Sequence, residues 1–204
     1  MHRAPAFTAA VLLFMAGSGL EAQAATVTGK VTGAPAPPQS KHSGYGKYRR
    51  GEAPAGKTPH PLIVIFNPDP PGKVPAPPVA HPVMDQKNEQ FSPRALPVMV
   101  GGTVDFLNSD SFYHNVFSLS SPKKFDLGRY RQGNSRPVTF SKPGLVKLFC
   151  DIHPDMIGYI VVTETPWFAS ASVSGDYTIE NVPAGRYSVS VWHEALSEPQ
   201  AIRS

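Results

Sequence analysis

Residues 148–162 read LFCDIHPDMIGYIVV, and this stretch holds the chain's single cysteine, Cys150. His153 and Met156 follow it in the spacing C-x-x-H-x-x-M. Two apolar runs typical of β-strands overlap the ends of the stretch, Leu145–Cys150 leading into it and Ile157–Thr163 leading out of it. Pro154 fixes its own φ and helps to hold the turn between the two runs. The sequence therefore places a thiol, an imidazole and a thioether on one side of a tight loop.

The first 24 residues predict that this chemistry operates outside the cytoplasm. MHRAPAFTAAVLLFMAGSGLEAQA has a short basic start, an apolar run from about residue 6 to residue 17, and a small-x-small end at residues 22–24. This layout is typical of a secretory signal. The apolar run is shorter than the roughly 20 residues of an ordinary membrane span. We expect a periplasmic or secreted protein without stable membrane insertion; a retained N-terminal anchor is the alternative.

A lone cysteine in an exported protein needs an explanation, because disulfides persist there and use cysteines in pairs. Cys150 is a partner in an intermolecular bond, a free buried thiol or a metal ligand. Together with His153 and Met156 it makes a soft donor set, which suits Cu(I) and tolerates Cu(II). An electron-transfer copper site takes two histidines, one cysteine and a weak axial methionine. One histidine is still missing from this set.

His114 is the best candidate for the missing ligand among the seven histidines. It lies in NSDSFYHNVFS, after the predicted strand Thr103–Leu107 and at the entry to another. The next residue, Asn115, can hydrogen-bond to the backbone and orient the ligand. The predicted metal ligands are therefore His114, Cys150, His153 and Met156, with Asn115 in support. Zinc on the same cysteine and histidines is an alternative.

The rest of the chain predicts an all-β fold, because its 23 prolines and 17 glycines recur between short apolar or alternating runs. Residues 1–24 are the predicted signal, 25–83 hold N-terminal strands and loops, 84–164 form the metal domain, and 165–204 form a small β module. The last segment is too short for a core of its own. We expect it to pack with N-terminal strands; packing on the metal domain or truncation is the alternative. The predicted strands are Thr26–Thr32, Leu62–Phe66, Leu96–Val100, Thr103–Leu107, Asn115–Ser118, Arg136–Ser141, Leu145–Cys150, Ile157–Thr163, Asp176–Glu180 and Arg186–Trp192.

The formal charge of +4 is modest, and much of the basic character lies in a Pro/Gly-rich stretch. Residues 41–57 of that stretch are either a solvated loop or a docking patch for an acidic partner. We expect no nucleic-acid partner, because the chain is exported and carries no recognition motif.

The His114-Asn115 pair followed by C-x-x-H-x-x-M resembles the cupredoxins, the small blue copper proteins, over residues 84–164. The short gap before Met156 is similar to that of amicyanin and shorter than that of plastocyanin. The runs FSPRALPVMVGGTVDFLNSD and PVTFSKPGLVKLFC are similar to the strands that lead to the first histidine and to the cysteine. MDQ at residues 84–86 and FDLG at residues 125–128 resemble periplasmic proteins labelled methylamine utilization protein, and residues 172–194 resemble a carboxypeptidase-regulatory-like β module.

This resemblance implies a Greek-key cupredoxin sandwich with one type 1 copper, cycling between Cu(II) and Cu(I), and a small additional β module. It implies a monomeric electron carrier, not an enzyme, that exchanges single electrons with a redox protein such as a dehydrogenase or a cytochrome, with amine oxidation as one process that it would serve. His153 would lie nearest the surface, and Phe149 and Pro154 could form its docking rim. The alternative is a protein that binds and delivers copper. A multicopper enzyme is disfavoured, because no H-x-H pair remains for a second centre.

Overall fold

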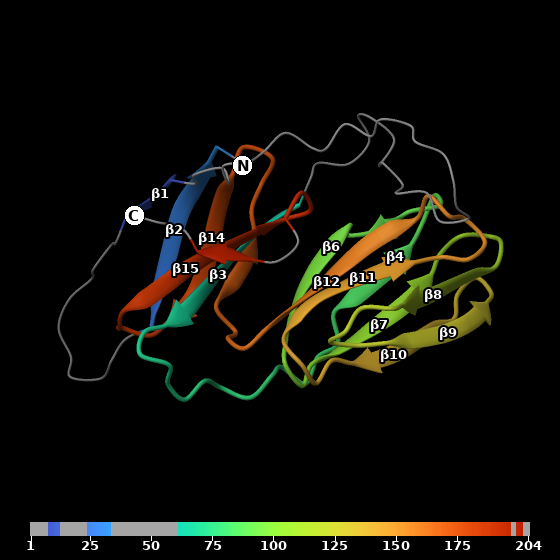
Figure 1. The fold of residues 1–204 in the computed structure, drawn as a ribbon, viewed down its shortest axis with the longest axis horizontal. Coiled ribbons are helices and arrows are strands. Elements are labelled where there is room, and N and C mark those ends of the chain that lie inside the picture. The colour runs from blue at the N-terminus through green and yellow to red at the C-terminus, as the bar shows by residue number, and fades with distance from the viewer. Residues whose placement is uncertain (1–7, 13–23, 34–60, 197–198, 202–204) are drawn as a thin grey trace. The chain divides into compact units, whose positions relative to one another are not determined.

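The structure of the chain is a computed structural model that describes residues 8–12, 24–33, 61–196 and 199–201. Every regular element among these residues is a β-strand, which confirms the all-β prediction. The chain divides into two compact units (Figure 1). The strands are β1 (Thr8–Leu12), β2 (Ala25–Thr32), β3 (Leu62–Pro68), β4 (Val83–Gln86), β5 (Phe91–Ser92), β6 (Ala95–Met99), β7 (Thr103–Asn108), β8 (His114–Ser118), β9 (Phe125–Tyr130), β10 (Ser135–Thr139), β11 (Gly144–Phe149), β12 (Ile157–Thr163), β13 (Phe168–Ser170), β14 (Asp176–Val182), β15 (Tyr187–His193) and β16 (Gln200–Ala201).

The metal unit, whose described part is residues 76–164, is a sandwich of two sheets. One sheet has the strand order β6-β12-β11-β8-β9 and the other has the order β10-β7-β4-β5. Strand β12 pairs antiparallel with β11 and parallel with β6, so it is a central strand. All of its residues are buried, which explains why it reads as a continuous apolar run rather than an alternating one.

The core of the metal unit lies between the two sheets. Strand β7 alternates between half-buried and buried residues and sends Val104 and Phe106 into this core, as expected for a strand with one buried face. Strand β11 contributes Val146 and Leu148 from the opposite sheet. Cys150 and Met156 belong to the same cluster of buried residues. The predicted metal loop is therefore anchored in the packed interior of the sandwich.

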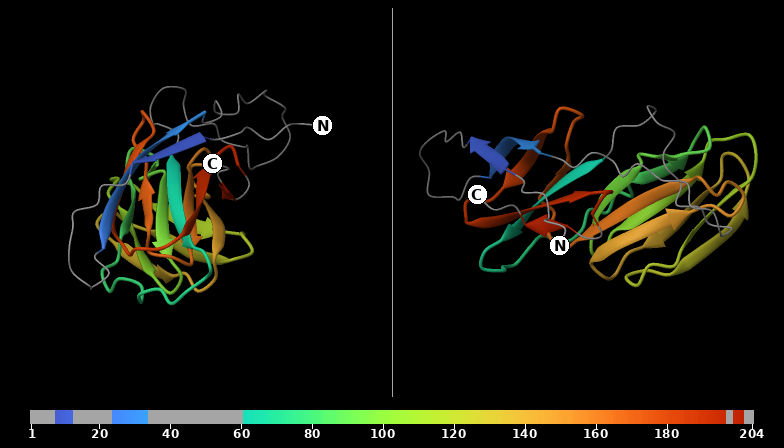
Figure 2. Two further views of the ribbon diagram at one scale, coloured as in Figure 1. Left: turned by 90° about the vertical axis from the view of Figure 1, so that its left-hand side faces the viewer. Right: turned by 45° about the horizontal axis from the view of Figure 1, so that its top comes forward.

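The second unit, called here the terminal unit, combines strands from both ends of the described chain. Strand β14 pairs with β2, and β15 pairs with β3, so early and late strands lie side by side (Figures 1 and 2). Its core includes Val64 and Phe66 of β3, Ile179 of β14, Val191 of β15 and the indole of Trp167. The C-terminal segment thus gains the partners that its short length requires.

Several strands were not predicted, and each is short, exposed or irregular. Strand β9 contains Asp126 and Gly128 and is exposed at several positions, so it lacks an apolar pattern. Strands β5, β13 and β16 have only two or three residues. The stretch Asn67–Pro82, predicted as a loop, forms no strand after residue 68. Most of the stretch Gly33–Pro61, including the basic residues 41–57, lies outside the described residues.

The predicted signal, residues 1–24, is described only at residues 8–12 and 24. Residues 8–12 form β1, which pairs with β2 at the edge of its sheet. Removal of the signal would leave the pairing of β2 with β14 in place. Among the described residues, no helix has the length and hydropathy needed to cross a bilayer.

Candidate metal centre

Three predicted ligands come together at one end of the five-stranded sheet. His114 begins β8, Cys150 follows the last residue of β11, and His153 lies in the loop that leads to β12. Strands β8 and β11 are neighbours and pair antiparallel through Phe117 and Phe149. This pairing brings the start of one strand beside the end of the other. The ligand atoms of His114, Cys150 and His153 all lie within 4.8 Å of one another.

The spacing of these donors fits a single metal ion. His114 Nδ1 lies 3.6 Å from Cys150 Sγ and 3.2 Å from His153 Nδ1. A tetrahedral ion bound at about 2.0–2.1 Å to nitrogen and about 2.3 Å to sulfur separates two nitrogens by roughly 3.3 Å and a nitrogen from a sulfur by roughly 3.6 Å. The two separations from His114 agree with these values, and the Cys150 and His153 ligand atoms lie within 4.8 Å of each other. The residues therefore fit a metal, and the thiolate and imidazole donors suit copper or zinc.

Asp110 orients the ring of His114. His114 Nε2 lies 2.8 Å from Asp110 Oδ2, and both side chains are buried. In a neutral imidazole the nitrogen that faces the carboxylate carries the proton, so Nδ1 keeps its lone pair toward Cys150 and His153. Sequence reasoning did not identify Asp110. The sequence feature that could have identified it is a carboxylate four residues before the histidine in NSDSFYH.

Asp110 is itself held by a tight turn between β4 and β5. Asn88 and Glu89, the two central residues of this turn, both have positive φ, the backbone geometry of a type I′ hairpin turn. Their backbone N–H groups donate to Asp110 at 2.7 and 2.9 Å. Burial alone would raise the pKa of Asp110, but these N–H groups and His114 outweigh it and lower that pKa below its ordinary value. Asp110 is therefore held as a carboxylate facing the buried imidazole.

Asn115 connects β8 to the loop that carries the cysteine. Its Oδ1 accepts a hydrogen bond of 2.7 Å from the backbone N–H of Asp151, and its Nδ2 donates to Asp126 at 3.3 Å. The first contact fixes the residue next to Cys150 relative to the residue next to His114. Asn115 therefore takes the position expected of a group that supports the two ligands.

Met156 and His153 differ in burial. Met156 is almost fully buried, and its backbone N–H donates to the His153 carbonyl at 2.9 Å, closing the turn around Pro154. His153 is half-buried, whereas His114, Cys150 and Met156 are buried. His153 is thus the most accessible of the four predicted ligands. The role of Met156 as a ligand stays a prediction.

Phe112 covers the two histidines and was missed by sequence reasoning. Its ring centroid lies 5.1 Å from that of His114 and 5.2 Å from that of His153, and 40% of Phe112 is exposed. The sequence feature that could have identified it is an aromatic residue two positions before the predicted ligand His114. Phe149, which was proposed for the rim, stacks on Phe117 at 5.6 Å, and Pro154 is exposed.

The other described histidines do not join this cluster. His81 Nδ1 lies 3.2 Å from the exposed carboxylate of Asp105. His193 lies in the terminal unit, where its Nδ1 accepts from the Ala195 N–H. Within residues 8–12, 24–33, 61–196 and 199–201, the cluster of His114, Cys150 and His153 is the one close group of three or more His, Cys, Asp or Glu ligand atoms.

Neither a protein-family model nor a curated protein matches the chain. Solved structures are similar to parts of it. A Cu-containing nitrite reductase (NirK) from Thermus scotoductus SA-01 is 30% identical over 42% of this chain with a TM-score of 0.40, and the match spans only 23% of the reductase. A purple cupredoxin from Nitrosopumilus maritimus is 26% identical, with a TM-score of 0.37, over 40% of this chain and 99% of the cupredoxin. A reduced amicyanin mutant is 21% identical, with a TM-score of 0.39, over 49% of this chain and 98% of amicyanin.

Proposed function

We propose that the chain is a type 1 copper protein that carries single electrons. The observation that supports this most directly is the convergence of His114 Nδ1, Cys150 Sγ and His153 Nδ1 at metal-ligand spacing, in a sandwich whose core includes Met156. Bound copper would supply the one-electron couple between Cu(II) and Cu(I). His114, Cys150, His153 and Met156 would hold it.

The protein's contribution is a site whose ligands stay in place. Asp110 fixes the ring of His114, and Asn115 fixes the backbone beside Cys150. A site of this kind favours electron transfer, because little must rearrange when the charge of the metal changes. Cys150 is buried, so its sulfur is shielded from water and from other thiols. This shielding accounts for an unpaired cysteine in a protein that we propose to be exported.

His153 and Phe112 would form the route to a redox partner. His153 is the most accessible predicted ligand, and the exposed Phe112 ring lies against both histidine rings. An exposed aromatic surface at a metal ligand suits contact with another protein. We propose that this partner is a periplasmic dehydrogenase or cytochrome, with amine oxidation as one process that it would serve. We also propose that the chain works as a monomeric carrier without substrate chemistry of its own.

The visible spectrum of the copper-loaded protein tests this function. Loaded protein is expected to show the intense absorption of a thiolate–Cu(II) site and to lose it reversibly on reduction. Cys150→Ser is expected to abolish the absorption, whereas His81→Gln, which removes a histidine paired with an exposed carboxylate, is expected to retain it. Colourless protein that binds one copper per chain would favour copper delivery instead. A visible band that survives in Cys150→Ser would overturn the ligand assignment.

A further inference from the structure

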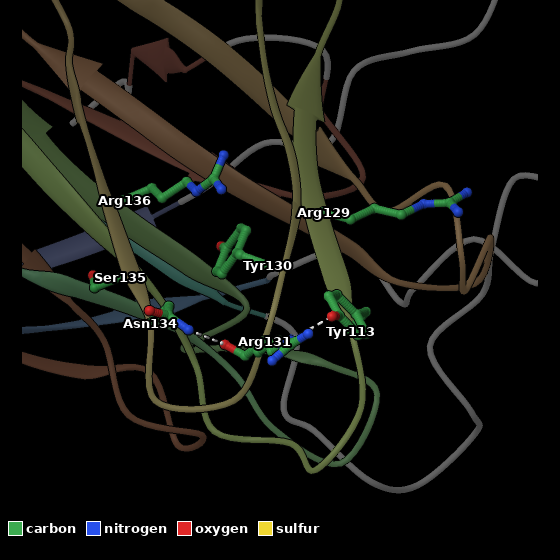
Figure 3. Close-up of a pocket in the computed structure, with 7 residues that line it drawn as sticks. All are labelled: Tyr113, Arg129, Tyr130, Arg131, Asn134, Ser135 and Arg136. Atoms are coloured by element: carbon green, nitrogen blue, oxygen red, sulfur yellow. Dashed lines mark hydrogen bonds between the residues drawn. The ribbon is translucent and has the colours of Figure 1, made fainter.

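Three exposed arginines lie on an open edge of the metal unit. The edge is formed by β9 and β10, which are the outer strands of the two sheets, and a recess of about 300 Å³ lies between them (Figure 3). Arg129 is on β9, Arg131 follows β9, and Arg136 is on β10. These three residues and the exposed side chain of Tyr113 are called here the arginine edge.

The arginine edge adjoins the candidate metal centre. Tyr113 immediately precedes the predicted ligand His114. Arg129 Nη2 lies 3.0 Å from Asp151 Oδ2, and Asp151 immediately follows Cys150. A protein bound at this edge would therefore lie beside two of the predicted ligands.

Arg131 is held in place by Tyr113. Its Nε donates a hydrogen bond to the Tyr113 hydroxyl (Figure 3), and its guanidinium lies over the Tyr113 ring at 5.5 Å. Within the described residues, no carboxylate lies in salt-bridge contact with Arg131. Its charge is therefore offered to the surface on a side chain that is already ordered.

Arg136 is held in a similar way on the other strand. Its Nη1 donates to the Leu127 carbonyl, and its guanidinium lies over the Tyr130 ring at 5.1 Å. No carboxylate of the described chain is in salt-bridge contact with it either. Guanidinium groups held in this manner lose less conformational freedom when they bind a partner.

The three guanidinium groups point in different directions. Figure 3 shows those of Arg131 and Arg136 on different sides of the Tyr130 ring, and the side chain of Arg129 extends away from that of Arg136. A single small anion cannot contact all of them. A protein surface that carries several carboxylates can pair with each arginine separately, so the arrangement fits an extended acidic partner.

We propose that the arginine edge docks the acidic surface of a protein partner, and the proposal rests on the proposed function in taking this partner to be the redox protein. Arginine and tyrosine are enriched among the residues that contribute most to binding at protein interfaces. Complementary charge also accelerates association. Charged side chains protect exposed sheet edges from pairing with other chains as well. That role needs no partner, so binding measurements separate the two.

An NMR titration of the ¹⁵N-labelled full chain with a dodecaglutamate peptide tests the proposal. We expect saturable shifts of the amides of Tyr113 and residues 129–136. Arg131→Gln/Arg136→Gln is expected to weaken binding by about tenfold or more, because two charge-assisted contacts are lost. The matched control is Lys30→Gln/Arg186→Gln, which removes the same charge from the terminal unit and is expected to bind as the native chain does.

Equal loss of affinity in the two double variants, or shifts spread evenly over both units, would overturn the proposal, because net charge alone would then explain binding. Absence of shifts at residues 129–136 would also overturn it and leave edge protection as the role of the arginines. Inorganic phosphate, titrated at the same ionic strength, is expected to bind much more weakly than the peptide. Equally tight binding of phosphate would contradict an extended acidic partner.

Electron exchange with inorganic oxidants separates failure of this proposal from failure of the proposed function. Hexacyanoferrate(III), an anion, takes one electron from Cu(I) protein to give hexacyanoferrate(II) and Cu(II) protein, so recovery of the visible band measures the rate. We expect this rate to fall by about threefold or more in Arg131→Gln/Arg136→Gln and to stay unchanged in the control pair. A cationic tris(phenanthroline)cobalt(III) oxidant should show no such fall.

A band that recovers equally fast in both double variants would overturn docking at the arginine edge and leave the proposed function standing. Absence of any band would remove the proposed function instead. The peptide titration needs no copper, so it decides the role of the arginine edge in either case.

Discussion

His114 Nε2 lies 2.8 Å from Asp110 Oδ2, and this pair connects the candidate metal centre to a turn on the opposite sheet. Asp110 accepts two backbone N–H bonds from the turn between β4 and β5, while His114 begins β8. The orientation of the buried ligand is therefore set by both sheets of the sandwich. The packing of the two sheets against each other therefore also fixes the geometry of the candidate metal centre.

Asp110→Asn is expected to weaken metal binding. The amide keeps an oxygen that can face His114 Nε2 but removes the negative charge that favours the correct tautomer. Loss of such a supporting carboxylate typically lowers metal affinity by about 10–100-fold. Competition with a chelator of known affinity measures the change. Asp105→Asn, at an exposed carboxylate paired with His81, is the control and is expected to leave the affinity unchanged. Equal affinities for all three proteins would remove Asp110 from the site.

Asp110 is also expected to make the metal-free unit sensitive to acid. Its native pKa lies below the ordinary value of 3.8, so the native state binds this proton less readily than the unfolded chain does. The stabilisation is present above the unfolded-state pKa and is lost as pH falls through the lowered native pKa. Urea unfolding of metal-free protein between pH 6 and pH 2, followed by circular dichroism, measures this. The loss on acidification should be smaller in Asp110→Asn; an identical pH profile would contradict the assignment.

Asn115→Ala is expected to loosen the cysteine loop. The substitution leaves the Asp151 N–H without its acceptor and costs about 1–3 kcal/mol of unfolding free energy. Hydrogen exchange at the Asp151 amide gives a local readout and should become faster. Asn134→Ala, which removes one exposed side-chain contact to the Arg131 carbonyl, is the matched control. Unchanged protection of the Asp151 amide would show that Asn115 does not hold the loop.

Gly175→Ala tests the packing of the terminal unit. Gly175 has a positive φ of 89°, and an added Cβ would collide with the Val31 carbonyl oxygen. We expect a loss of about 3 kcal/mol or more, from backbone strain and the collision together. Both tryptophans, Trp167 and Trp192, lie in the terminal unit, so their fluorescence reports its unfolding.

Gly133 supplies the control for this substitution. It also has a positive φ, 78°, but no atom lies within 4 Å of the added Cβ. Gly133→Ala is therefore expected to cost only about 1 kcal/mol from backbone strain, measured by circular dichroism because it lies in the metal unit. Similar losses at Gly175 and Gly133 would show that the contact with Val31 is not as described.

The sequence predicted the features that rest on local pattern. Continuous or alternating apolar runs located β7, β11 and β12, and the spacing around Cys150 located the loop between β11 and β12. His114 could be predicted from the sequence because it lies at the entry to a strand and is followed by an asparagine. The convergence of His114, Cys150 and His153 within metal-ligand distance could not be predicted from local pattern, because it depends on the pairing of β8 with β11.

The features that were missed depend on contacts between distant residues. Asp110 has no distinguishing local pattern; its role comes from the turn at Asn88 and Glu89, over twenty residues earlier. Strand β9 has charged and glycine residues because it is an exposed edge. The recess beside it arises only when β9 and β10 become the outer strands of two sheets. Sequence pattern carries little information about such edges.

The pairing of β14 with β2 and of β15 with β3 has a consequence for synthesis of the chain. All strands of the metal unit precede residue 164, whereas β14 begins at residue 176. Because the ribosome synthesises the chain from its N-terminus, all strands of the sandwich are made while β2 and β3 still lack β14 and β15. Unsatisfied strand edges recruit other chains. Synthesis of this chain thus includes an interval in which one unit is ready to fold and the other is a target for chaperones.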